Sequence, residues 1–91
     1  EDNERHYISL KDKLDAWFKW PSNYMFKFIV PNDNKLVTLV ETWFGPEAKI
    51  RHMNSAQNNY VSISVEVIMP SSESVINIYR KASEVKGLVA L

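Results

Sequence analysis

The sequence contains no cysteine and only two glycines among its 91 residues. Without cysteine the chain cannot form disulfides, thiolate nucleophiles, or zinc and iron–sulfur sites built on cysteine. With two glycines it cannot form the glycine-rich loops that hold phosphate groups. The absence of cysteine also fits a reducing compartment, and the N-terminal stretch lacks the apolar core of a signal peptide. We therefore expect a cytoplasmic protein without a cofactor.

The chain also has no excess of either charge, since 11 basic residues balance 11 acidic ones. Domains that bind nucleic acid usually carry a basic stripe, so the neutral balance argues against such a partner. No apolar run approaches the roughly 20 residues that a membrane helix needs, so no membrane contact is expected. A neutral protein lacks the charge repulsion that opposes self-association, which favours a homodimer or contact with another protein.

What the sequence does contain is typical of one folded domain. Its hydrophobic content is 45% and its aromatic content 12%, in the range of globular proteins of this length. We assign residues 1–9 to an N-terminal extension and residues 10–91 to a single domain. The prolines and glycines, which interrupt regular structure, divide this domain into segments.

The apolar pattern of each segment predicts one helix or strand. We expect helices over 10–19, from Asn32 or Asp33 to Phe44, and from Ser71 or Ser72 to Gly87, and strands over 23–30, 47–53, 58–69 and 88–91. The first two helices place Trp17 and Leu39 on their apolar stripes. A βαββαβ order after a short N-terminal helix predicts an α+β ferredoxin-like sandwich, with a four-stranded antiparallel sheet and two helices on one face.

The strand over 58–69 alternates strictly. Its β-branched residues, Val61 among them, point toward the helices, which leaves Tyr60, Ser62, Ser64 and Glu66 on the open face of the sheet. The neighbouring central strand adds Met25, Lys27 and Ile29 to that face. One aromatic ring and one lysine make a poor platform for stacking bases. RNA binding is therefore the least favoured of the three functions that we consider. A merely solvated face explains Ser64 and Glu66 best.

The sequence offers no pattern typical of catalysis or of metal binding. His6 and His52 are the only histidines, and neither has a carboxylate or a second histidine at the spacing of metal ligands. No nucleophile elbow is present. We expect no catalytic residue, no metal site and no enzymatic activity. The clustered aromatic residues are best explained as core, because small domains need large side chains to fill it.

Two stretches resemble the YbeD-like family of small bacterial proteins of unknown function. In LKDKLDAWFKWPSNYMFKFIV, a short amphipathic helix leads into Trp20-Pro21 and a strand with Phe26-Lys27. The family signature Pro-Ser-Ser-Lys-Gly-x-Tyr-x-Ser corresponds to residues 54–62, where Ser55, Tyr60 and Ser62 match and the proline, second serine, lysine and glycine do not. At the glycine position, Asn58 can supply the left-handed backbone.

The resemblance implies a ferredoxin-like domain similar to ACT-type regulatory modules, which bind small ligands between paired domains. It also suggests a link to lipoate metabolism. Two functional hypotheses lead: a non-enzymatic regulatory or protein-interaction domain that forms a homodimer, and an ACT-like sensor of an amino acid or a lipoate-related metabolite. The predicted contact surface comprises Ser55, Tyr60, Ser62, Lys27, Met25 and Ile29.

Overall fold

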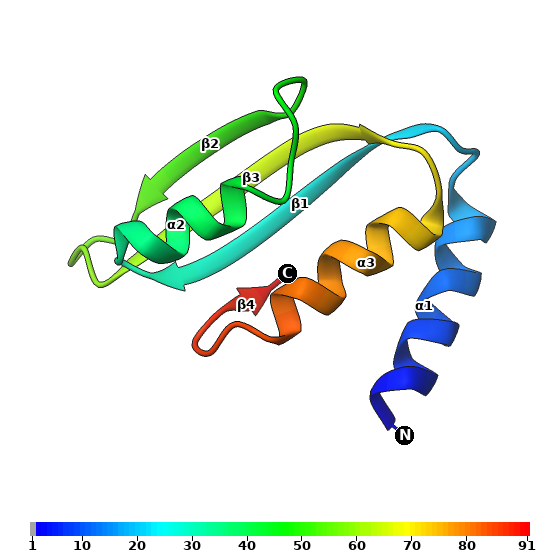
Figure 1. Ribbon diagram of the computed structural model, residues 1–91, viewed down its shortest axis with the longest axis horizontal. Helices are drawn as coiled ribbons and strands as arrows, with labels where there is room; N and C mark the ends of the chain where they lie inside the picture. Colours follow the sequence, from blue (N-terminus) through cyan, green and yellow to red (C-terminus); the bar gives the residue numbers. More distant parts are fainter. Residues whose placement is uncertain (1) are drawn as a thin grey trace.

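A computed structural model describes residues 2–91 of the protein, and the side chains of residues 4–91. Seven elements follow one another along the chain (Figure 1). The helices are α1 (Asp2–Trp17), α2 (Asn34–Glu41) and α3 (Ser72–Ser83), and the strands are β1 (Ser22–Pro31), β2 (Lys49–Asn54), β3 (Tyr60–Met69) and β4 (Val89–Ala90). Within the described residues, no helix is long and apolar enough to cross a lipid bilayer.

The four strands form one antiparallel sheet in the order β2-β3-β1-β4. The two central strands pair along their whole length, from Ser22 opposite Met69 to Pro31 opposite Tyr60. Helices α2 and α3 cover the same face, and α1 lies against the outer side of α3 (Figure 1). This is the ferredoxin-like arrangement that the element order predicted, with one helix added in front.

The core lies between the sheet and the helices, as the alternation predicted. Phe26, Phe28 and Val30 of β1 are fully buried, and every second residue of β3, from Val61 to Met69, is buried beside them. The ring of Phe26 lies 5.5 Å from that of Tyr79 in α3 (centroid to centroid). Burying this many large apolar side chains is the main source of stability in a small domain.

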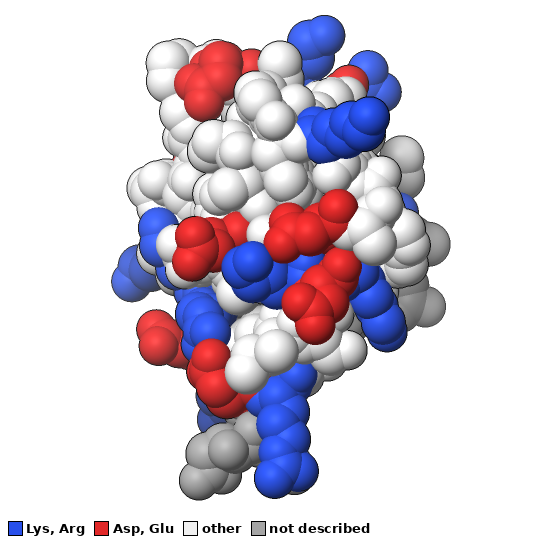
Figure 2. Space-filling model, turned by 90° about the vertical axis from the view of Figure 1, so that its right-hand side faces the viewer, with Lys and Arg blue, Asp and Glu red and all other residues white. Residues whose placement is uncertain are grey.

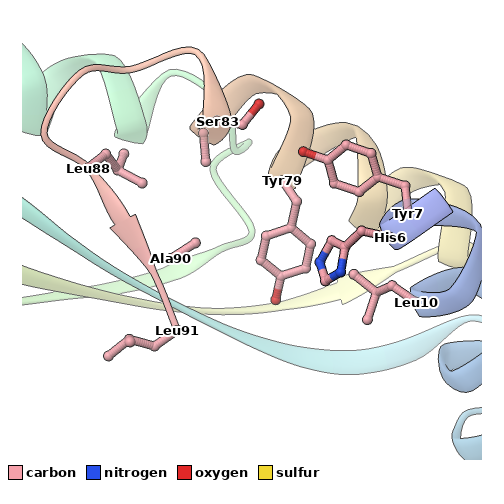
Figure 3. A pocket seen from close by; sticks show the side chains of 9 residues that line it. His6, Tyr7, Leu10, Tyr79, Ser83, Leu88, Ala90 and Leu91 are labelled. Carbon is pink, nitrogen blue, oxygen red and sulfur yellow. The ribbon is translucent and has the colours of Figure 1, made fainter. Parts of the chain in front are cut away.

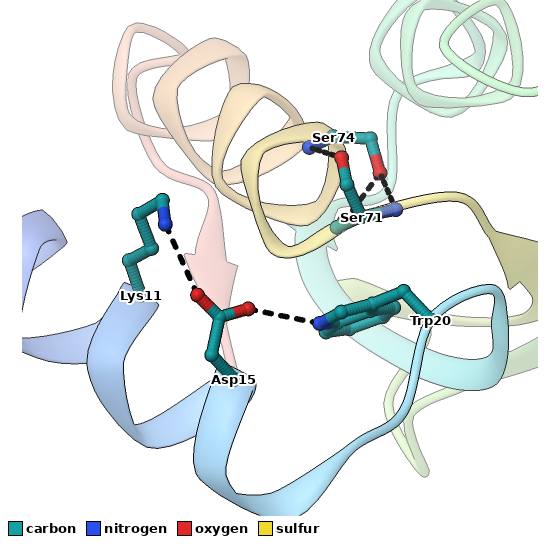
Figure 4. Close-up of polar contacts among 5 residues, drawn as sticks. All are labelled: Lys11, Asp15, Trp20, Ser71 and Ser74. Carbon is teal, nitrogen blue, oxygen red and sulfur yellow. Dashed lines mark hydrogen bonds and ion pairs between the residues drawn. The ribbon is translucent and has the colours of Figure 1, made fainter.

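Side-chain oxygens cap both helices that cover the sheet. The Asp33 carboxylate accepts a hydrogen bond from the amide of Lys35 (2.9 Å) at the start of α2. At the start of α3, the Ser71 hydroxyl accepts from the amide of Ser74 (3.1 Å) and the Ser74 hydroxyl accepts from the amide of Ser71 (3.2 Å) (Figure 4). Of the alternatives that the sequence left open, Asp33 and Ser71 are therefore the caps.

The first helix differs most from its predicted form. Helix α1 begins at Asp2 rather than at residue 10, because its contact with α3 continues along Tyr7 and Leu10. Of its side chains, Leu14 reaches the core and is only 2% exposed. Trp17, which we expected on the buried stripe, is 69% exposed. The predicted stripe was wrong at Trp17 because α1 packs against another helix, so only a narrow strip of its surface is buried.

The other two helices end earlier than predicted. Helix α2 stops at Glu41 rather than at Phe44, and Leu39 is 40% exposed. The chain leaves the helix there so that Trp43 can place its ring edge-on to Phe28, with 5.8 Å between the ring centroids. Helix α3 stops at Ser83 rather than at residue 87.

Candidate functional site

The face of the sheet opposite α2 and α3 carries no helix, and we call it the open face (Figure 1). The strand register arranges its side chains in rows across β2, β3 and β1. The three central rows are Lys49–Glu66–Met25, Arg51–Ser64–Lys27 and Met53–Ser62–Ile29. Most of these residues line a shallow groove with a volume of about 510 Å³.

Five of the six predicted contact residues lie on the open face. Met25, Lys27 and Ser62 line the groove itself. Ile29 is half-buried between Ser62 of β3 and Val89 of β4. Tyr60 lies beyond the end of the groove, opposite Pro31 of β1, and is 51% exposed.

The sixth residue, Ser55, belongs to the turn between β2 and β3. Its hydroxyl accepts hydrogen bonds from the amides of Asn59 and Tyr60 (3.1 Å each), and its own amide donates to the carbonyl of Tyr60 (2.9 Å). Asn58, in the same turn, has φ of 59°, the left-handed conformation that the sequence predicted for this position. The geometry gives Ser55 a role in shaping the turn.

Three cations lie in adjacent rows of the open face. Within the described part of the chain, Lys27, Lys49 and Arg51 form no ion pair, although Lys49 stands directly opposite Glu66. The Glu66 carboxylate instead accepts a hydrogen bond from the side-chain amide of Asn23 (2.8 Å). The open face therefore carries unneutralised positive charge.

Both signs of charge are instead present on the side of the molecule formed by α1 and α3, where red and blue side chains alternate (Figure 2). Arg80 of α3 donates two hydrogen bonds to Glu4 of α1 (3.0 and 2.8 Å). The same guanidinium lies 4.5 Å from the centre of the Tyr7 ring. Arg80, like Lys11 beside Asp15 in α1, is thus paired with a carboxylate of the molecule itself.

Exposed apolar side chains also gather on the open face. Nine large apolar side chains are exposed in the described part of the chain. Five of them project from the open face of the sheet: Met25, Met53, Tyr60, Ile68 and Val89. Five of the nine exposed apolar side chains therefore share this face, and apolar surface gathered in this way is a common mark of protein contact sites.

A cavity of about 360 Å³ lies between α1, α3 and the C-terminal segment (Figure 3). It is lined by His6, Tyr7, Leu10, Tyr79, Ala82, Ser83, Leu88, Ala90 and Leu91. The Tyr79 hydroxyl is 2.9 Å from the Tyr24 hydroxyl, and burial, followed by this hydrogen bond, raises the Tyr79 pKa above its usual range. The Ser83 hydroxyl donates to the carbonyl of Arg80 (2.7 Å). Of the polar side chains that line this mostly apolar space, those of His6 and Tyr7 make no hydrogen bond within residues 4–91.

The two histidines lie in different parts of the molecule. His52 of β2 has its Nε2 2.9 Å from the carboxylate of Glu41, on the helix side of the sheet edge, whereas His6 lines the cavity. Among residues 4–91, no three histidine, aspartate or glutamate side chains come together as metal ligands.

A protein-family model matches residues 15–90, which is most of the chain, and its description is Protein of unknown function (DUF493). The chain belongs to the DUF493 family. This is the YbeD-like family that the two sequence stretches resembled. Searches of curated proteins and of solved structures gave no match.

The two candidate sites, the open face and the cavity, differ in how much of each lies within the residues that the DUF493 model matches. Every residue of the open face lies within residues 15–90, whereas His6, Tyr7 and Leu10 of the cavity precede the matched segment. The open face is thus built from the part of the chain that defines the family.

Six groove residues lay outside the predicted contact surface: Lys49, Arg51, His52, Met53, Ser64 and Glu66. Ser64 and Glu66 were placed on the open face as solvated residues, and Lys49, Arg51 and Met53 were predicted only as part of the strand over 47–53. The alternation of these three residues with Ile50 was the sequence signal that could have placed them together on one face of the sheet. What the alternation could not supply was the register that sets Arg51 beside Ser64.

Proposed function

We propose that this DUF493 chain is a non-enzymatic interaction domain of the cytoplasm and that the open face is its contact surface. One observation carries the proposal: five exposed apolar side chains and three unpaired cations share a sheet face that no helix covers. On the other face of the sheet, the inward side chains Phe26, Phe28 and Val30 of β1 and those of β3 from Val61 to Met69 are buried. Leaving large apolar groups in water is unfavourable, and a partner that covers them gains that free energy.

Two features of the open face fit contact with a protein. Methionines such as Met25 and Met53 have flexible, polarisable side chains that adapt to different partner surfaces. Tyr60 offers an aromatic ring of the kind enriched in the centres of protein interfaces. A regulatory role by partner binding, including binding of a second copy of the chain, follows from such a surface.

Site-specific photo-crosslinking in the source cell tests the proposal. Benzoylphenylalanine replaces Met53 or Tyr60 on the open face, and Ile8 on α1 serves as the matched control because it is also exposed, by 57%. We expect protein adducts from both open-face positions and none from the control. An adduct of two copies identifies a homodimer. Equal adducts from all three positions, or none from the open face, would contradict the proposed function.

The cavity supports a second candidate function, an ACT-like sensor of a small metabolite. Its volume of about 360 Å³ lies within the roughly 300–1,000 Å³ of ligand sites. A panel of amino acids and lipoyl compounds should then raise the melting temperature, since a ligand at 100 times its Kd adds about 2.7 kcal/mol of stability. We expect His6→Ala to abolish the shift and His52→Ala to preserve it. No shift with any compound would exclude this candidate for the panel tested.

A further inference from the structure

Building on the proposed contact surface, we infer that the partner of the open face is another protein, and that it docks through a segment whose carboxylates are flanked by large apolar side chains. The inference follows from the order of the rows on the sheet. A cationic row lies at the centre of the groove, and apolar side chains lie on both sides of it.

The central row forms a site for a carboxylate. Arg51 of β2 and Lys27 of β1 stand on either side of Ser64 of β3. Because neighbouring strands are about 4.8 Å apart, the backbones that carry the two cations are about 10 Å apart, and both long side chains reach the space above Ser64. The Ser64 hydroxyl can donate a hydrogen bond to an anion held there.

The protein itself does not neutralise this row. The one carboxylate on the neighbouring positions, that of Glu66, is held by the side-chain amide of Asn23 at 2.8 Å. No acidic side chain in the described part of the chain pairs with Lys27 or Arg51. A partner that supplies the missing negative charge therefore gains electrostatic complementarity.

The apolar flanks indicate a protein segment as the occupant. On one side of the cationic row lie Met53 and Ile29, with Val89 beyond them, and on the other side lies Met25. A small anion such as phosphate would leave these side chains in water. A nucleic acid strand would need aromatic rings for its bases, and Tyr60 is the one ring on this face.

A second copy of the chain matches the open face poorly. Stacking two open faces would place the cations of one copy, Lys27, Lys49 and Arg51, against the same cations of the other. Like charges brought together across an interface oppose association. The charge of the open face thus favours a different, acidic protein.

Peptide display on the intact protein tests the inference. A library of random peptides of about ten residues, long enough in extended form to follow β3, is selected against the immobilised chain. Enriched peptides are then measured by fluorescence anisotropy on wild type, on Lys27→Glu/Arg51→Glu, on Met53→Asp, and on Lys13→Glu/Lys35→Glu. The last variant makes the same change of charge as the first at exposed positions of α1 and α2. Circular dichroism checks that all four proteins are folded.

We expect the enriched peptides to combine Asp or Glu with large apolar residues. Their Kd should rise at least about tenfold on Lys27→Glu/Arg51→Glu, stay within about twofold on the control, and rise at an ionic strength of 1 M, where the screening length is about 3 Å. Enriched peptides without carboxylates that still need Met53 would overturn the acidic partner and leave the proposed function standing. Peptides insensitive to every open-face substitution, or no enrichment, would count against both.

Discussion

Ser55 and Tyr60 are neighbours in the β2–β3 hairpin, and each is used in a different way. The Ser55 hydroxyl accepts hydrogen bonds from two backbone amides of the turn. The Tyr60 ring projects from the open face and is 51% exposed. Two residues that the sequence grouped into one surface should therefore respond to substitution in opposite ways.

Ser55→Ala should destabilise the fold without a direct effect on the open face. Removing the hydroxyl leaves the amides of Asn59 and Tyr60 without their acceptor, which lowers the free energy of unfolding by about 1 kcal/mol. Urea denaturation measures the change. Ser62→Ala is the control, because Ser62 lies on the open face and should change stability by less than about 0.5 kcal/mol. Equal changes for both serines would contradict the role given to Ser55.

Tyr60→Ala should show the reverse behaviour. We expect a loss of stability of about 1 kcal/mol or less, since half of the ring is already in water, together with weaker binding of open-face peptides. Phe28→Ala provides the comparison for a fully buried ring and should cost about 3–5 kcal/mol. A variant that loses its fold on Tyr60→Ala would make Tyr60 a structural residue and remove it from the site.

At the scale of helices and strands, local chemistry predicted more than packing did. Strict alternation placed β3 and identified its buried side, and capping chemistry limited the start of each covering helix to two residues, one of which is correct. Helix lengths were predicted less well. They depend on tertiary contacts, such as that between α1 and α3, which a local pattern does not contain.

For the candidate site, too, the sequence predicted which residues share a face of the sheet but not which of them lie side by side. Alternation placed Met25, Lys27 and Ser62 on one face, because side chains two residues apart point the same way. The row that joins Lys27 to Arg51 depends on the register of two strand pairs. Register across a sheet is fixed by long-range packing and turn geometry, so it emerged only from the structure.

The end of α1 should give the protein a specific dependence on acid. The Asp15 carboxylate accepts hydrogen bonds from Lys11 (3.0 Å) and from the Trp20 indole (2.9 Å) (Figure 4). The side chain of Ser72, followed by that of Lys11, lowers the pKa of Asp15 below its ordinary value of 3.8. Because the lowered pKa belongs to the folded state, this stabilisation is present above that ordinary value and is lost as the pH falls through the lowered pKa.

Asp15→Asn should therefore flatten the acid limb of the stability curve. The free energy of unfolding, measured by urea denaturation from pH 6 downward, should fall less steeply below about pH 4 in the variant than in wild type. Asp12→Asn, on the same helix, is the control and should follow wild type. The assignment is falsified if both variants lose the same part of the acid dependence.

For the whole molecule, a net charge of zero conceals an uneven distribution. The α1 and α3 side carries both signs and holds ion pairs such as that of Arg80 with Glu4, while the charges on the open face are mostly of one sign. The net charge of zero therefore describes neither of these two sides of the molecule. Contacts made by the two sides should depend on salt in different ways.

Self-association through the open face should increase with salt. At low ionic strength, repulsion among Lys27, Lys49 and Arg51 of two copies keeps the chain monomeric. Added salt screens this repulsion and leaves the apolar contact, so the dimer fraction should rise. Sedimentation velocity at high micromolar protein measures this, with Met53→Asp as the variant expected to stay monomeric. A single monomeric species at every salt concentration would remove the homodimer hypothesis.

Because β4 is short, the backbone amides of β1 should differ in how fast they exchange hydrogen with solvent. Strand β4 pairs with Phe28 and Ile29, and the amide of Leu91 adds a bond to the carbonyl of Lys27, so on the edge of β1 that faces away from β3 no described strand borders the first half of β1. Amides of an antiparallel strand point alternately to its two neighbours.

The backbone amides of Asn23 and Met25 precede that of Lys27 by four and two residues, so they point the same way as it does, away from β3. The amides of Tyr24 and Phe26 point toward β3. In deuterium oxide the first pair should exchange fast and the second pair slowly. A polypeptide that added itself to this edge would slow Asn23 and Met25 together, which makes two amide signals a direct report on whether the sheet has grown by a strand.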